Sequence, residues 1–483
     1  MSTPLPAQSP SVYIDRRRRL AAAIPGPTMI VAGRPRARNY AANLFPYRAD
    51  SHFLYLVGAS LPRAVLLGEG DRWELFAEPP TAASALWHGE EASFEAIAAA
   101  TGVAKVRPLV ELDVALAAAG GAARIGTVPA IDPLTRARQA ATLSRPWGLR
   151  DDEDQGPAPL EGADAALADA LITLRLRHDP AALEHLRVAA TGTRAAHLAG
   201  MAASAPGVPE AVVVAAIEGA MAARGMGPAY NSIVSVHGEV LHNEHHFNVL
   251  GEGDLLLCDA GAEHAGWASD VTRTWPVSGR FSSTQRDLYD LVLAAQAAAI
   301  AGVRPGARFR DLHLLASLTI ARGLVDLRIL RGDPEGLVER GAHALFFPHG
   351  LGHLLGLDVH DMEDLGDRAG YAPDRQRSAQ FGLRSLRLDR DLQPGMLVTI
   401  EPGLYLVPAI LADRELCGPF DRDGALDRER LRHFADVRGI RIEDDVLCTT
   451  GDPEVLTAAI PKDPLAVQEH VGAAASVAAG RSA

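Results

Sequence analysis

The sequence is poor in cysteine, with only Cys258, Cys417 and Cys448 among its 483 residues. Three widely separated cysteines exclude a disulfide framework and a zinc site built from thiolates. Cys258 adjoins an aspartate on an apolar run, and we interpret it as a packing residue rather than a reactive thiol. This cysteine usage is typical of a reducing compartment, so we expect a cytoplasmic protein.

Basic residues are also in the minority, because 47 Lys and Arg face 60 Asp and Glu and give a net charge of −13. Nucleic acids and anionic membranes bind basic surfaces, so we expect neither as a partner. The sequence has no run of 18 or more apolar residues, as a membrane-spanning helix requires. Arg16–Arg19 precede an apolar stretch, as in a signal peptide, but Pro25 and Pro27 interrupt that stretch.

The length of 483 residues, with 48% hydrophobic residues, predicts a globular protein of two domains. Up to about residue 150, helical stretches alternate with short apolar strands at 28–31 and 64–67, which indicates an α/β domain. We place the boundary near residue 175, which gives domains at 1–175 and 176–483. Further helices are predicted at 163–176, 180–202 (with Asp179 as its cap), 209–224, 283–301 and 309–323.

The residues from His349 to Asp361 hold three histidines and three glycines. Glycine disfavours a helix, so we expect an extended segment in which His349 and His353 share a face. His360 joins that face only if the chain bends. A lone histidine is more often a core or surface residue, but three this close indicate a site if acidic partners exist elsewhere.

Four carboxylates provide such partners. Asp259 ends an apolar strand, and Asp270 lies on a run rich in β-formers that would return as a hairpin. Glu401 ends a second apolar strand, and Glu443 follows Arg441 on one face of a third. A carboxylate at an apolar strand end is poorly tolerated unless it is paired or binds a metal. Any one of these residues is explained by a salt bridge, but the full set indicates a metal site.

The residue types predict the chemistry of that site. Four carboxylates balance two divalent cations and leave one histidine as a neutral ligand. Such an oxygen-rich set suits Mn²⁺ best, with Co²⁺, Fe²⁺ or Zn²⁺ as alternatives. Two metal ions roughly 3.5–4 Å apart activate a water molecule and polarise a carbonyl group. The predicted reaction class is metal-assisted hydrolysis.

The five expected ligands resemble, in identity and order, those of the pita-bread metallopeptidases: Asp259, Asp270, His353, Glu401 and Glu443. The strings HGLGHLLGLDVHD, TIEPGLY and GIRIEDD are most similar to the Xaa-Pro aminopeptidases (aminopeptidase P), and residues 45–58 resemble their amino-terminal domain. The resemblance implies an α+β protein with an α/β amino-terminal domain and a pita-bread (creatinase/aminopeptidase-like) catalytic domain. It also implies release of the amino-terminal residue from Xaa-Pro peptides.

The same resemblance implies how the ligands divide between two metal ions. Asp259 would chelate one ion, while Asp270 and Glu443 would bridge both. His353 and Glu401 would complete the shell of the second ion. Glu401 is also the expected general base, because it can take a proton from the attacking water.

The resemblance implies accessory roles as well. His360 would steady an oxyanion or pass a proton, and His349 would lie against the proline-side residue. His242 would stand near the site mouth and Tyr230 would line the pocket, although a surface and a core position are the respective alternatives. Arg441 would hydrogen-bond the acidic ligands, or form a purely structural salt bridge.

The remaining expectations concern assembly and two charged stretches. Trp87 matches a position that reaches a neighbouring subunit's active site in the family, which forms dimers or tetramers; a half-buried Trp that fixes a local turn is the alternative. Residues 361–391, rich in arginine, and 411–436 are expected to be solvated loops.

Two competing functions remain open. A dipeptidase specific for Xaa-Pro must recognise a free carboxylate, and the arginines of 361–391 offer candidates for that role. A non-catalytic binding protein of the same fold is disfavoured, because this chain keeps all five expected ligands.

Overall fold

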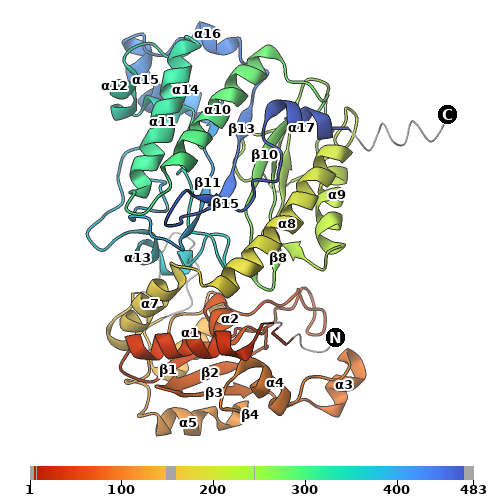
Figure 1. The fold of residues 1–483 in the computed structure, drawn as a ribbon, viewed down its shortest axis with the longest axis vertical. Helices are drawn as coiled ribbons and strands as arrows, with labels where there is room; N and C mark the ends of the chain where they lie inside the picture. Colours follow the sequence, from red (N-terminus) through yellow and green to blue (C-terminus); the bar gives the residue numbers. More distant parts are fainter. Residues whose placement is uncertain (1–4, 7, 148–158, 244, 473–483) are drawn as a thin grey trace, which may run out of the picture. The chain divides into compact units, whose positions relative to one another are not determined.

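The computed structural model describes residues 5–6, 8–147, 159–243 and 245–472. The chain forms two compact units that divide between Leu176 and Arg177, and the short segment Met362–Gly366 groups with the first unit. Both units mix helices and sheets (Figure 1), which confirms the expected α+β architecture with two domains. Among the described residues, no helix combines the length and the apolar character needed to cross a membrane.

The amino-terminal unit is built on a sheet with the strand order β1-β2-β3-β4. The first three strands pair antiparallel and β4 runs parallel to β3. Sheet residues such as Met29 and Phe76 pack against Leu116 and Leu143 of the helices. The elements are α1 (Pro10–Ala23), β1 (Thr28–Val31), α2 (Ser51–Val57), β2 (Val65–Glu69), β3 (Arg72–Ala77), α3 (Ala82–His88), α4 (Phe94–Thr101), β4 (Lys105–Pro108), η1 (Leu109–Glu111), α5 (Leu112–Ala118), α6 (Pro133–Leu143) and α7 (Gly162–Arg175). The strands predicted at 28–31 and 64–67 and the helix at 163–176 are therefore confirmed.

The first half of the carboxy-terminal unit begins with a pair of helices and continues with short strands. Asp179 caps the first helix as predicted, since its Oδ1 accepts a 2.8 Å hydrogen bond from the amide of Ala182. The elements are α8 (Pro180–Ala203), α9 (Glu210–Ala222), β5 (Gly227–Pro228), β6 (Ile233–Ser235), β7 (Leu255–Asp259), β8 (Ala262–His264), β9 (Trp267–Ala268) and β10 (Thr272–Pro276).

The second half repeats this order. A capping box at Ser282 and Gln285 starts its first helix. The elements are α10 (Ser283–Gly302), α11 (Phe309–Asp326), α12 (Pro334–Glu339), η2 (Ala342–Leu345), η3 (Glu363–Leu365), α13 (Asp367–Gly370), β11 (Leu397–Ile400), β12 (Gly403–Tyr405), α14 (Pro408–Ala412), α15 (Arg414–Arg422), α16 (Arg428–Arg432), β13 (Gly439–Arg441), β14 (Asp444–Leu447), β15 (Glu454–Val455) and α17 (Pro464–His470).

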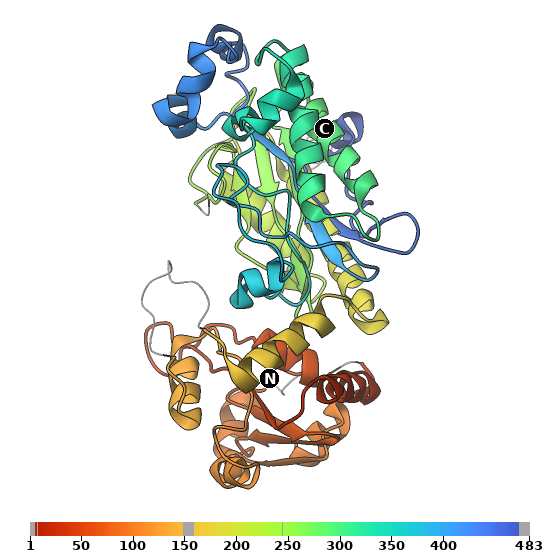
Figure 2. The same ribbon diagram turned by 90° about the vertical axis from the view of Figure 1, so that its left-hand side faces the viewer.

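The helices of this unit cover its strands in pairs. α8 packs on α9 and α10 packs on α11 (Figures 1 and 2). Met201 and Ile217 of the first pair meet Leu256 and Trp275 of the strands in one buried cluster. The helix pairs therefore support the strands from behind and leave their ends to carry polar groups.

Strand pairing brings the predicted acidic residues together. β7 and β10 pair antiparallel with Asp259 opposite Thr272, so Asp270 lies just beyond the end of the ladder. β11 and β14 pair with Ile400 opposite Asp444, which places Glu401 beside Glu443. Because neighbouring ends of antiparallel strands meet at one edge, two hairpin-like pairs collect four carboxylates.

The histidine-rich segment follows the predicted extended course beside β11 from Leu351 to Leu355, where the amides of Glu401 and Thr399 donate to the carbonyl oxygens of Leu351 and His353. It forms one isolated β-bridge, between Leu354 and Val398, and the chain then bends in the residues that follow. Its pairing with β11 is close, because a Cβ on Gly352 would lie 2.0 Å from the carbonyl oxygen of Thr399. The glycine is needed for this approach, and the bend brings His360 back to the histidine pair.

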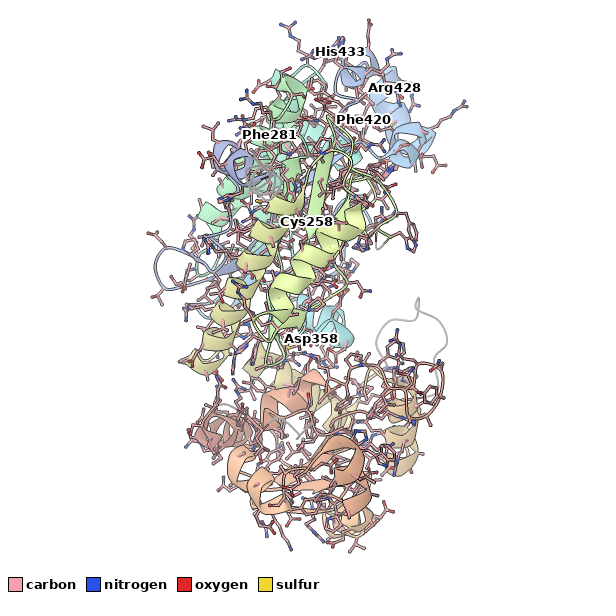
Figure 3. The ribbon with its side chains drawn as sticks, turned by 90° about the vertical axis from the view of Figure 1, so that its right-hand side faces the viewer. Cys258, Phe281, Asp358, Phe420, Arg428 and His433 are labelled. Carbon is pink, nitrogen blue, oxygen red and sulfur yellow. The ribbon has the colours of Figure 1, made fainter. Side chains whose placement is uncertain are left out.

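The prediction of a solvated loop at 411–436 is wrong. This stretch forms the end of α14 and all of α15 and α16, which gather at one end of the unit with Phe420, Arg428 and His433 (Figure 3). Cys417 and Phe420 are buried while the charged residues face outward. The apolar positions were too few and too widely spaced among the charges to stand out in the sequence.

Candidate metal centre

Tyr230 links the first two carboxylates of the candidate centre. Its hydroxyl group lies 2.5 Å from Oδ1 of Asp259 and 2.6 Å from Oδ1 of Asp270. One hydroxyl proton serves both oxygens, so the two aspartates must lie close together. The hairpin that the sequence predicted therefore brings Asp259 and Asp270 to one place, and Tyr230 contacts both.

The second pair of carboxylates faces the first. The ligand atoms of Asp270, His353 and Glu443 all lie within 4.8 Å of one another. Nε2 of His353 lies 3.4 Å from Oδ2 of Asp270 and 3.4 Å from Oε1 of Glu401. The five residues predicted as ligands thus form one cluster.

Two side chains orient this cluster by hydrogen bonds, the cationic Arg441 and the neutral Thr272. Arg441 donates a 2.5 Å hydrogen bond to Oδ2 of Asp259 and a 2.8 Å bond to the hydroxyl of Thr272. Thr272 in turn donates to Oε2 of Glu443 at 2.7 Å. The predicted hydrogen bond from Arg441 to the acidic cluster is therefore present in the structure.

The pKa values of the carboxyl groups reflect their crowding. Burial raises the pKa of Glu401 to about 8, and Asp270 and Asp259 add to this rise by repulsion. Burial, then Asp270 and Glu401, raise the pKa of Glu443 well above its usual range. Burial also raises the pKa values of Asp259 and Asp270, although Arg441 opposes this. Holding all four groups ionised requires further positive charge.

The donor set fits divalent cations. Nδ1 of His353 lies 3.0 Å from the carbonyl oxygen of Leu354, which places the ring proton on Nδ1. The Nε2 lone pair then faces the oxygens of Asp270 and Glu401. An acceptor nitrogen and anionic oxygens repel one another unless a cation lies between them, so the geometry and the charge both suit a metal ion.

The cluster lies in a cavity of about 260 Å³. Nine of the ten predicted site residues line it, and the tenth, Tyr230, contacts its floor through Asp259 and Asp270. The lining residues are Leu241, His242, Asp259, Asp270, His349, Gly350, Gly352, His353, His360, Ser385, Arg387, Glu401, Arg441 and Glu443.

The accessory histidines have distinct surroundings. The ring centroids of His353 and His360 lie 4.1 Å apart, so the chain makes the bend on which their meeting depended. His349 is held at both nitrogens, with Nδ1 2.8 Å from Gly350 O and Nε2 2.8 Å from the hydroxyl of Tyr405. Burial and Arg441 lower the pKa of His349 to about 3, so this ring is neutral. Burial also lowers the pKa of His242.

Several residues around the centre were missed in the sequence. Tyr405 contacts both His349 and Arg441, and Thr272 joins Arg441 to Glu443. Arg387 was noted only as one of many arginines in the stretch 361–391, yet it lines the cavity. No local pattern marks these residues, because their contacts depend on how distant segments pack.

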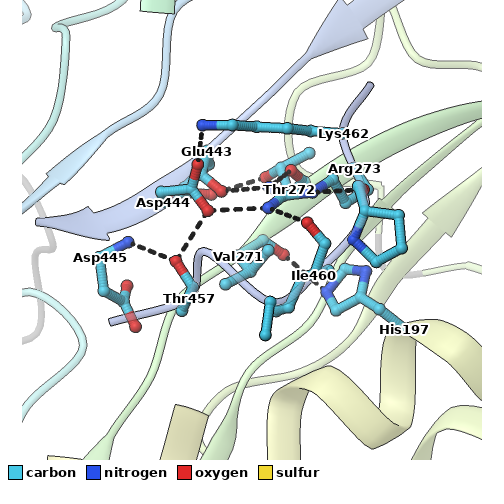
Figure 4. Close-up of polar contacts among 12 residues, drawn as sticks. His197, Val271, Thr272, Arg273, Glu443, Asp444, Asp445, Thr457, Ile460 and Lys462 are labelled. Carbon is cyan, nitrogen blue, oxygen red and sulfur yellow. Dashed lines mark hydrogen bonds and ion pairs between the residues drawn. The ribbon is translucent and has the colours of Figure 1, made fainter. Parts of the chain in front are cut away.

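A buried polar network supports the strands behind the centre (Figure 4). Arg273 is fully buried and donates to the backbone oxygen of Glu443 and, at 2.7 Å, to Oδ1 of Asp444. Lys462 donates to Oδ2 of Asp444 at 2.6 Å. These two cations lower the pKa of Asp444 to about 2 despite its burial, so the network fixes β14 with its charge satisfied.

Comparison with known proteins defines the class that this fold and site represent. Residues 184–450 match the model of metallopeptidase family M24, and residues 13–125 match the aminopeptidase P amino-terminal domain. The first match spans more than half of the chain, and the chain therefore belongs to metallopeptidase family M24.

Within this family the similarity to aminopeptidase P extends over nearly the whole chain. Xaa-Pro aminopeptidase of Escherichia coli is 30% identical over 471 residues, which cover 93% of this chain and 95% of the relative. The structure of Pseudomonas aeruginosa aminopeptidase PepP matches with a TM-score of 0.77 and 28% identity, covering 97% of this chain and 99% of that one. E. coli aminopeptidase P with the inhibitor Pro-Leu has a TM-score of 0.77 and 29% identity over the same shares. Human Xaa-Pro dipeptidase is 34% identical, but over 64% of this chain and 62% of its own length.

Proposed function

We propose that the protein is a metallo-aminopeptidase that releases the amino-terminal residue from peptides with proline in second position. The observation that carries this proposal is a cavity lined by four carboxylates, in which Nε2 of His353 lies 3.4 Å from oxygens of both Asp270 and Glu401. The similarity to aminopeptidase P over both units supports it, because the dipeptidase match covers a smaller share of the chain.

We assign two divalent ions to the cluster. Asp259 would hold one ion, Asp270 and Glu443 would contact both, and His353 with Glu401 would complete the second. The predominance of oxygen donors favours Mn²⁺. When bound, the ions supply Lewis acidity for an attacking water and for the scissile carbonyl.

The side chains of the cavity supply proton transfer. The Xaa-Pro bond is a tertiary amide without an N–H group, so its nitrogen must gain a proton as proline leaves. Glu401 is placed to take a proton from the water, since its carboxylate lies in the cluster and lines the cavity. His360 also lines the cavity beside His353, where an imidazole can donate to the developing oxyanion or to the leaving nitrogen.

Four further residues shape the site in this proposal. His349 presents its ring to the proline side, because Gly350 and Tyr405 occupy its nitrogens. His242 stands at the cavity wall beside Leu241. Tyr230 and Arg441 act on substrate through the aspartates that they orient.

The test is a peptidase assay on metal-free protein. We expect release of the first residue from Xaa-Pro-Yaa peptides after Mn²⁺ is added, and no release from otherwise identical peptides with alanine in place of proline. Hydrolysis of both peptides at equal rates would refute the specificity for proline.

A second activity is favoured by Arg387. Its guanidinium group lines the cavity, and its charge partly opposes the rise that burial causes in the pKa of Glu401, so it lies within electrostatic reach of the centre. A cation there suits the free carboxylate of an Xaa-Pro dipeptide. If it serves that purpose, Arg387→Leu raises KM for Xaa-Pro dipeptides far more than for Xaa-Pro-Yaa peptides. Equal changes for both lengths would show that the protein is an aminopeptidase without a dipeptide site.

Three broader assignments belong to this proposal. We assign the functional domains to residues 1–175 and 176–483, a division that accommodates both family matches. The three cysteines are free and buried, which agrees with the cytoplasm as the working compartment. Trp87 is 79% exposed, which supports a role in a dimer or tetramer over that of a half-buried residue.

A further inference from the structure

His197 on α8 contacts the two strand ends that carry Asp259 and Asp270. Its Nε2 lies 3.0 Å from the carbonyl oxygen of Ala260 and 3.1 Å from that of Val271. Each carbonyl belongs to the residue directly after one of the two aspartates. One imidazole thus contacts the main chain beside both carboxylates, and Figure 4 shows its contact with Val271.

The chemistry of the ring makes it a donor at this position. His197 is fully buried, and among the described residues its Nδ1 has no hydrogen-bond partner. Two carbonyl oxygens can only accept, so the ring proton must lie on Nε2, where both oxygens share it. Burial and the neighbouring Arg273 lower the pKa of His197 to about 4, so the ring stays neutral.

The backbone around the two aspartates explains why such a donor is needed. The regular ladder ends at the pair Asp259 and Thr272, and beyond it the amide of Ala260 donates to Val271 O and that of Ser269 to Ala262 O, each at 3.1 Å. The amide of Asp270 turns instead toward the carboxylate of Asp445, at 3.2 Å. The ladder is therefore irregular where the two ligands project, and His197 contacts the carbonyl oxygens of both segments at this irregularity.

We infer that His197 is a positioning residue that sets the spacing of Asp259 and Asp270 and thereby the metal affinity of the centre. The inference rests on the proposed metal site. Tyr230 holds the two carboxylates together at their oxygens, while His197 holds their backbones from the helix side. Loss of the imidazole leaves two buried carbonyl oxygens without their shared donor and frees the strand ends to move apart.

A purely structural role predicts different behaviour. A buried histidine that only fills space is replaced by leucine with a change in stability and no change in metal binding. The edge contact with Trp275, whose ring centroid lies 6.4 Å away, belongs to this packing component. Metal affinity separates the two roles, because it depends on where the aspartates point.

The experiment compares His197→Leu with His197→Gln, whose amide retains N–H donors for the two carbonyls. Metal-free wild-type and variant proteins are titrated with Mn²⁺ by calorimetry, and their thermal unfolding is recorded without metal. Leu186→Ala is the control, because Leu186 is a buried residue of the same helix three turns away. We expect His197→Leu to weaken Mn²⁺ binding by about 10- to 100-fold, and His197→Gln to restore most of the affinity. Leu186→Ala should lower the unfolding temperature and leave the affinity unchanged.

Two results would overturn the inference while leaving the proposed function intact. One is wild-type Mn²⁺ affinity in folded His197→Leu. The other is an equal loss of affinity in His197→Leu and Leu186→Ala variants of matched stability. If the wild type itself binds no Mn²⁺, the proposed metal site fails, and the inference fails with it.

Discussion

Single residues determine the charge of the centre. Asp259, Asp270, Glu401 and Glu443 bring four carboxylates into one buried region, where Arg441 pairs directly with Asp259. Burial without sufficient counter-charge raises the pKa values of these groups, which shows how strongly the site favours cations. At the residue scale we therefore predict that removing the negative charge of one carboxylate harms the centre more than removing its volume.

Asp270→Asn tests that statement, because it removes one charge and keeps the shape. We expect activity on Xaa-Pro-Yaa peptides to fall by more than about 100-fold, since the residue would contact both ions. Metal analysis should show fewer bound ions per chain. Asp290→Asn, at an exposed pair with Arg286, should change neither quantity. Full activity of Asp270→Asn with both ions bound would contradict the assignment.

His360→Ala tests the role of the second imidazole. His360 lines the cavity beside His353, so we expect its loss to lower kcat strongly while KM changes little. Steady-state kinetics on one Xaa-Pro-Yaa peptide provide both constants. A rise in KM with unchanged kcat would instead make His360 a residue that binds the substrate.

At the scale of elements, the strand ends place the ligands and glycines allow close backbone approach. The extended segment around His353 pairs with β11, and Gly352 lies against the carbonyl oxygen of Thr399. The backbone amide of His353 donates a 3.0 Å hydrogen bond to the hydroxyl group of Thr399, which holds the segment in place. The orientation of the histidine ligand therefore depends on a contact that only glycine permits.

Gly352→Ala is expected to disturb this contact. The added Cβ would lie 2.0 Å from Thr399 O, so the segment must move, at a cost of about 1–3 kcal/mol in unfolding free energy. Gly219→Ala on α9 meets no atom within 4 Å and should stabilise the helix by up to about 1 kcal/mol. Urea unfolding compares the two variants, and equal stabilities would contradict the close approach.

The elements also show what the sequence could predict. The long helices and the strand ends at Asp259 and Glu401 were predictable, because caps, apolar runs and turn residues mark them locally. The helices over 411–436 were missed, since charged residues dominate their short exposed turns. Tyr405 and His197 were missed for another reason: their partners lie 36 to 74 residues away in sequence, and only packing brings them together.

At the scale of the whole molecule, the proposed chemistry belongs to the carboxy-terminal unit. Every residue that lines the cavity lies between Leu241 and Glu443 and outside the segment Met362–Gly366. This unit also buries several neutral histidines. His313 is fully buried against Phe347, and burial lowers its pKa to about 3. Such a group links the stability of the unit to pH.

The sign of that link follows from the direction of the shift. The unfolded chain takes up a proton at His313 below the ordinary pKa of about 6.5, whereas the folded chain does not. The stability contribution is therefore complete above pH 6.5 and is lost as the pH falls. His313→Phe should reduce the slope of unfolding free energy against pH by about 1.4 kcal/mol per unit between pH 6 and 4. Parallel slopes in urea unfolding of variant and wild type would contradict the burial of a neutral ring.

The most direct test measures bound ions and turnover in one titration. Metal-free protein receives increasing Mn²⁺ while release of the first residue from an Xaa-Pro-Yaa peptide is recorded at each step. We predict that the rate rises from zero and reaches its plateau when two ions are bound per chain. A full rate in the metal-free protein, or no release when both ions are bound, would contradict a dinuclear Xaa-Pro aminopeptidase.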